Sequence, residues 1–207
     1  MKKIFVVTML CALAVTSATG YAQSTAKQLK AERKAMEARV KELSAEGWKS
    51  LQSDGLALLI SEHNAKRRNN PDLYEISGTA NQVKTTNLGK AKSRNNAINE
   101  YAEYCSGMLR ARIVSDLHDV DEAQADNMVS GYERILSQKL EGEVRPSYYI
   151  YKEVGNGKYD VRGFFLIDEN RLAKKQKEAI KEAADQANMA FDYGNNISDF
   201  INQNFNR

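Results

Sequence analysis

Residues 144–167 read VRPSYYIYKEVGNGKYDVRGFFLI, and this stretch decides the fold. Two β-prone runs, Val144–Val154 and Lys158–Ile167, flank the turn sequence Gly155-Asn156-Gly157. Glycine and asparagine tolerate the positive φ of tight turns, so the stretch predicts a β-hairpin. In the second run Phe164 and Phe165 point to opposite faces of the strand, and we expect both faces to be covered there.

Upstream of the hairpin, residues 73–83 alternate in part and predict another strand. Tyr74, Ile76, Gly78 and Ala80 would share one face, and the two small residues predict a helix crossing close to it. A long helix follows, because apolar or small residues recur at steps of three and four. Its stripe comprises Leu88, Ala91, Asn95, Ile98, Ala102, Cys105, Leu109 and Ile113.

A second helix is expected to begin at Asp121, which forms a capping box with Gln124. Another charged helix should run from about Glu169 to Ala190. The order strand-helix-helix-strand-strand-helix predicts an α+β domain over residues 71–175, with a small, mostly antiparallel sheet and helices on one side.

The first 22 residues have the pattern of a secretory signal peptide. Lys2 and Lys3 precede the apolar run Ile4–Val15, and small residues precede a cut at Gln23. Cys11 follows the bulky Leu10, so no lipid attachment is expected there. The sequence predicts a periplasmic or outer-membrane-associated protein, with release outside the cell as an alternative.

Residues 23–70 predict a helical arm, because Ala26, Leu29, Met36, Val40 and Leu43 lie on one helical stripe. Gly47 should end this helix, and Trp48 should turn back toward the core. The stripe leaves self-association through the arm open. At the other end, residues 176–207 predict a helical tail whose apolar face includes Phe200 and Phe205, which favours contact with a partner or a membrane surface.

Composition limits the classes of function. The chain has 30 basic and 27 acidic residues, and removal of Lys2 and Lys3 leaves it nearly neutral. This balance gives no electrostatic reason to expect nucleic-acid binding. Of the two cysteines, only Cys105 follows the signal peptide, so no intramolecular disulfide is expected in the mature chain.

Three stretches resemble the Lpp-twenty lipoprotein family, small envelope domains related to the N-terminal module of a flagellar assembly protein. They are Ile76–Ala80, the Ala-rich helix Ala91–Ile113, and Ser137–Gly142 with the strand pair after it. The resemblance covers roughly residues 74–172. Glu46-Gly47-Trp48-Lys49 is also similar to exported proteins of Bacteroidetes type. The resemblance implies an envelope-associated structural or adaptor module and carries no catalytic residue.

Candidate chemistry is sparse. His118 with Asp119 and Asp121 is the densest imidazole–carboxylate group and leaves a hydrolase of envelope polymers as an alternative. His63 fits a cation near a helix C-terminus, and Cys105 fits a buried core position. No phosphate-binding glycine loop or nucleophile elbow occurs, so no cofactor, metal or catalytic residue is predicted.

The hairpin strand carries the best binding candidates. Tyr149 and Tyr151 would share a face close to Arg145, an arrangement of aromatic rings and cations that binds glycans or protein partners. Tyrosines packed inward would explain the same pattern. The sequence therefore predicts a non-enzymatic envelope adaptor, which contacts a protein or a cell-wall polymer through Arg145, Tyr149, Tyr151, Phe200 and Phe205.

Overall fold

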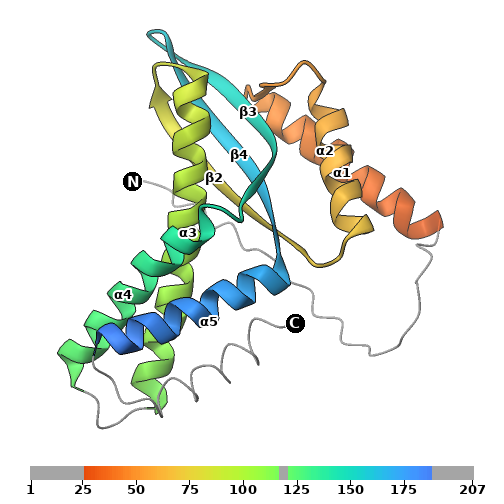
Figure 1. Ribbon diagram of the computed structural model, residues 1–207. Coiled ribbons are helices and arrows are strands. Elements are labelled where there is room, and N and C mark those ends of the chain that lie inside the picture. Colours follow the sequence, from red (N-terminus) through yellow and green to blue (C-terminus); the bar gives the residue numbers. More distant parts are fainter. Residues whose placement is uncertain (1–25, 117–120, 188–207) are drawn as a thin grey trace, which may run out of the picture.

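A computed structural model describes residues 26–116 and 121–187 and confirms the α+β fold (Figure 1). Four strands form one sheet in the order β1-β3-β4-β2, and every neighbouring pair is antiparallel. The strands are β1 (Lys49–Ser50), β2 (Leu73–Val83), β3 (Arg145–Gly155) and β4 (Lys158–Asp168). The helices are α1 (Ala26–Ala45), α2 (Leu56–Asn69), α3 (Thr86–Asp116), α4 (Glu122–Leu140) and α5 (Glu169–Gln186).

The predicted hairpin is confirmed as β3 and β4. Gly155, Asn156 and Gly157 take φ values of 86°, 53° and 65°. This left-handed region is open to glycine, which has no Cβ, and is tolerated by asparagine. Tyr149 pairs with Gly163 in the register that follows, and the register shifts between Pro146 and Tyr148. This irregularity is a β-bulge beside Ser147.

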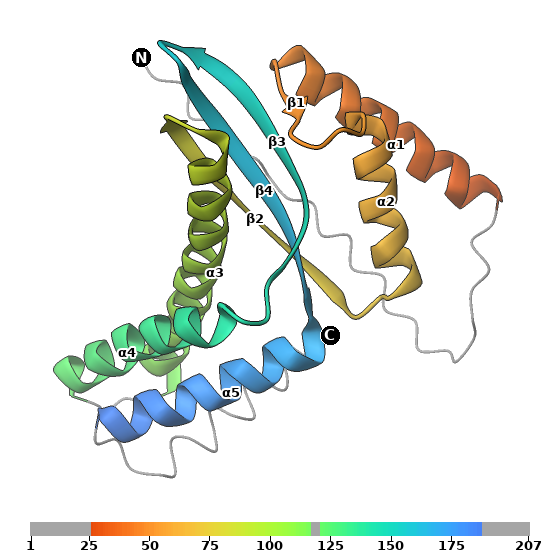
Figure 2. The ribbon, with the colours of Figure 1, turned by 45° about the horizontal axis from the view of Figure 1, so that its top comes forward.

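The expectation that helices cover one side of the sheet is wrong, because helices pack on both faces (Figure 2). Phe165 lies in a core shared with α3, α4 and α5. Phe164, Tyr148 and Ile150 lie in a second core, with apolar residues of α1 and α2. The physical reason is the run of bulky residues at the end of β4, which places apolar side chains on both faces of the strand.

The prediction that a helix crosses close to β2 is confirmed, but three of the eight residues of the predicted stripe are placed wrongly. Leu88 is 43% exposed, and Ala91 and Asn95 also face outward. Gly89, Ser93 and Ala97 face the sheet instead. A Cβ atom on Gly78 would lie 2.3 Å from the backbone oxygen of Ser93, so only small side chains fit between α3 and β2.

The region predicted as an arm contributes to the sheet. α1 ends before Gly47, whose φ is 83°, and Trp48 then turns into the core as predicted, with 4% exposure. Lys49 and Ser50 pair with β3 as its outer neighbour, and the Leu51 amide donates to the Tyr149 carbonyl. The α1–α2 unit is therefore joined to the sheet by backbone hydrogen bonds as well as by the second core.

α4 and α5 lie side by side beyond the end of the sheet (Figure 1). The Asp121 carboxylate accepts a hydrogen bond from the backbone N–H of Gln124, which confirms the predicted cap. Asp168 caps α5 in the same way, by accepting from the backbone N–H of Arg171. α5 continues across the expected boundary at residues 175 and 176, and Gln176 is fully buried. Within the described ranges, no helix is long and apolar enough to cross a membrane.

Candidate functional site

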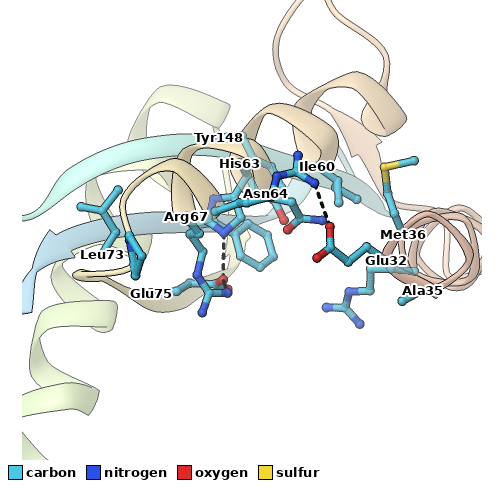
Figure 3. Close-up of a pocket in the computed structure, with 14 residues that line it drawn as sticks. Glu32, Ala35, Met36, Ile60, His63, Asn64, Arg67, Leu73, Glu75 and Tyr148 are labelled. Atoms are coloured by element: carbon cyan, nitrogen blue, oxygen red, sulfur yellow. Dashed lines mark hydrogen bonds and ion pairs between the residues drawn. The ribbon is translucent and has the colours of Figure 1, made fainter. Parts of the chain in front are cut away.

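A groove of about 570 Å³ lies where α1, α2 and the outer part of the sheet meet (Figure 3). Its floor is apolar and includes Ile60, Leu73, Tyr148 and Phe164. A smaller hollow of about 240 Å³ continues it between α1 and α2, with Met36 in both. The register of the sheet and the docking of α1–α2 create this site together.

Three charged or polar side chains form a hydrogen-bonded chain, and two of them, His63 and Glu75, line the groove. His63, which is 3% exposed, lies with Nε2 2.8 Å from Oε2 of Glu75 and with Nδ1 2.9 Å from Oγ of Ser147. The imidazole Nε2–H donates to the Glu75 carboxylate, and the bond between Nδ1 and Oγ completes the chain. The ring also meets Tyr148 edge-on at 5.3 Å. These contacts tie α2 to strands β2 and β3.

Burial and the neighbouring side chains act in opposite directions on the pKa of Glu75. Burial alone would raise the pKa of this carboxyl, but the hydrogen bond and charge of His63 and the charge of Arg67 outweigh it and lower the pKa below 4.5. The Arg67 guanidinium lies 3.1 Å from the same carboxylate oxygen. Glu75 is therefore an anion held by two partners from α2 (Figure 3).

Arginine side chains form the rim of the groove. Arg39, Arg67 and Arg68 are 41%, 47% and 44% exposed and pair with Glu42, Glu75 and Glu32. Each guanidinium has five N–H donors, so one ion pair leaves donors free to meet a ligand. An apolar floor with a cationic rim is suited to holding an amphipathic anion.

The predicted binding residues of β3 do not meet in this groove. Tyr149 is half-buried, packs edge-on against Phe165 at 5.7 Å and lies beneath the Lys90 ammonium. Tyr151 lines a different hollow of about 470 Å³ near the β1 edge. Arg145 is exposed at the start of the strand. Much of the tyrosine pattern thus serves packing.

The other residues considered from the sequence lie at a helix cap, in the core, or outside the described residues. Asp121 is the cap of α4, while His118 and Asp119 lie outside the described residues, as do Phe200 and Phe205 of the tail. Cys105 is buried beside Gln176, and burial raises the pKa of its thiol. Among the residues that the structure describes, no three His, Cys, Asp or Glu side chains gather as a metal site.

Sequence reasoning missed the groove because its residues come from five elements. The sequence predicts His63 to be a cation at the end of a helix, whereas the structure buries it against the sheet, where it bonds to residues of β2 and β3. The run Lys66-Arg67-Arg68 at the end of α2 was the available signal, since two of its members line the groove. Nothing local to that run indicates which carboxylates or rings it will meet.

No family model, curated protein or solved structure matches this chain. The resemblance to the Lpp-twenty lipoprotein family consequently stays a prediction, and the groove has to be interpreted from its own chemistry.

Proposed function

We propose that this protein is a non-enzymatic module of the bacterial cell envelope that works by holding a partner protein or a cell-wall polymer. The observation that carries the proposal is the groove between α1–α2 and the sheet, with its apolar floor and arginine rim. Binding sites commonly combine an apolar surface with a few convergent polar groups. The secretory pattern of residues 1–22 supports the envelope location, in the periplasm or at the outer membrane.

Ser147, His63 and Glu75 favour one competing function, hydrolysis of envelope polymers. Their connectivity is that of a serine–histidine–acid triad, with the roles of the two ring nitrogens exchanged. Two features favour the binding function instead. Ser147 is not among the residues that line the groove, and His63 is nearly inaccessible. A nucleophile and its base need access to the substrate.

A fluorophosphonate probe separates these functions, because it phosphonylates activated serines with loss of fluoride, irrespective of substrate. We expect no labelling of the mature protein above the level seen with Ser147→Ala. Labelling that depends on both Ser147 and His63 would make the protein a hydrolase and refute the binding proposal.

Affinity capture tests the binding function directly. The tagged mature protein is crosslinked in native envelopes, purified, and its partners are identified by mass spectrometry. We expect one dominant envelope component. Capture of nothing above background would count against the module, and the prediction that α1 self-associates would then be tested by solution mass.

A further inference from the structure

We infer that the groove binds a short acidic peptide segment of a partner protein, with its carboxylates on the arginine rim and an apolar side chain on the floor. This inference rests on the proposed binding function and assigns it a site and a ligand class. The chemistry follows from three properties of the groove: its spare donors, its charge and its size.

The rim arginines are free to exchange partners. The ion pairs of Arg39 and Arg68 join solvent-exposed groups, and such pairs contribute little to stability. A ligand carboxylate can therefore share or replace Glu42 beside Arg39, or Glu32 beside Arg68, at little cost. Guanidinium groups bind carboxylates through two parallel hydrogen bonds, which fixes the orientation of the ligand as well as its charge.

The charge of the groove favours an anion. Arg33 lines the smaller hollow, and Arg39, Arg67 and Arg68 line the larger or both. Glu32 and Glu75 are the carboxylates of these linings, and Glu75 is already bonded to His63 and Arg67. Glu37 and Glu42 pair with Arg33 and Arg39, so each of the four arginines already has a glutamate partner. The two helices that carry these arginines nevertheless hold nine Lys and Arg residues against four Glu, so the charge around the groove favours a ligand with carboxylates.

The size and floor of the groove favour a peptide. The larger hollow, of about 570 Å³, falls in the size range of ligand pockets, and the smaller one of about 240 Å³ extends it, which leaves room for a short peptide segment. Met36 connects them, and its unbranched side chain adapts to different apolar groups. Asn64 also lines both hollows and offers amide donor and acceptor atoms to a peptide backbone.

The probe is a fluorescein-labelled decapeptide of alternating glutamate and phenylalanine, blocked at both ends and titrated with the mature protein by fluorescence anisotropy. We expect saturable binding that weakens as salt is added, because the rim contacts are ionic and partly exposed. A counterpart with glutamine in place of glutamate should bind at least about ten-fold more weakly, as two lost charge-assisted hydrogen bonds predict.

The decisive protein variant is the double substitution Arg39→Gln and Arg68→Gln. It removes two exposed rim charges and leaves the His63–Glu75 contact intact, so folding should persist. Trp48, the single tryptophan, reports this through its fluorescence because it lies in the same core as the floor. The matched control is the double substitution Arg110→Gln and Arg134→Gln, which removes the same number of charges. Arg110 is 54% exposed and lies on α3, and Arg134 is exposed on α4, both away from the groove.

The double variant should weaken peptide binding about ten-fold or more, and the control less than two-fold. Equal loss in both variants would reduce the effect to overall charge and overturn the site. Equal binding of the glutamine peptide would overturn the ligand class, as would binding to phosphatidylglycerol vesicles without binding to the peptide. If the double variant captures the same envelope partner as the wild type, the groove assignment is overturned and the proposed function stands. If the wild type captures no partner, the proposed function itself is rejected.

Discussion

Substituting Gly78 with alanine tests whether close contact between α3 and β2 organises the fold. The added Cβ would lie 2.3 Å from both the backbone nitrogen of Ala97 and the backbone oxygen of Ser93. Ordinary contacts of this kind begin near 3.4 Å. Since backbone atoms cannot rotate away as a side chain does, α3 has to retreat by roughly 1 Å from the sheet along this contact.

The cost can be worked from this geometry. Overpacking a close-packed interface costs about 1–3 kcal/mol, and a clash with helix backbone belongs at the upper end of that range. Alanine returns about 0.5–1 kcal/mol because it restricts the unfolded chain more than glycine does. The net loss in the free energy of unfolding is therefore about 2 kcal/mol, or about 4–8 °C in Tm for a chain of this size.

Gly107→Ala, on the helix α3 that packs against Gly78, is the control. No atom lies within 4 Å of the position of its added Cβ, so helix propensity acts alone and should stabilise by about 0.5–1 kcal/mol. Both variants are compared with the wild type by thermal and urea unfolding followed by circular dichroism. A Gly78→Ala protein as stable as the wild type, or a Gly107→Ala protein that is equally destabilised, would show that the proposed close contact is not what constrains α3.

Three further substitutions or reactions test individual contacts. Folding lowers the pKa of Glu75 below 4.5, so its carboxylate stabilises the fold above pH 4.5 and this contribution is lost as the pH falls through the lowered pKa. When the pH is lowered through this range, the free energy of unfolding measured in urea should therefore fall less for Glu75→Gln than for the wild type. Burial raises the pKa of the Cys105 thiol, so a chromogenic disulfide reagent should react slowly with the folded mature chain and fast in denaturant, and equal rates would place this thiol at the surface. Asp121→Ala removes the acceptor of the Gln124 amide, 3.1 Å away, and should cost about 1 kcal/mol, whereas Asp121→Asn should retain most of the cap; equal unfolding midpoints for these two variants would contradict that role.

The sequence by itself determined the local elements. Positive φ at residues 155–157 requires glycine or asparagine, so the turn, and with it the register of β3 on β4, follows from the sequence near the turn. Alternation on β2 placed Gly78 under a helix, and Asp121 with Gln124 marked the start of α4. Each of these features depends on residues only a few positions apart, where dihedral preferences and side-chain spacing act directly.

The tertiary structure decided what these elements do together. The first half of α3 turns Ser93 and Ala97 toward Gly78, where the contact is too close for larger side chains, and leaves Leu88 43% exposed. The second covered face of the sheet arises when α1 and α2 fold onto Tyr148 and Phe164. His63 meets Glu75 and Ser147 only through that docking and through the sheet register, because the three lie on different elements and Ser147 is 84 positions from His63. Helical periodicity predicts that a face is buried, but the identity of its partner depends on long-range packing, and the candidate site is made of such long-range contacts.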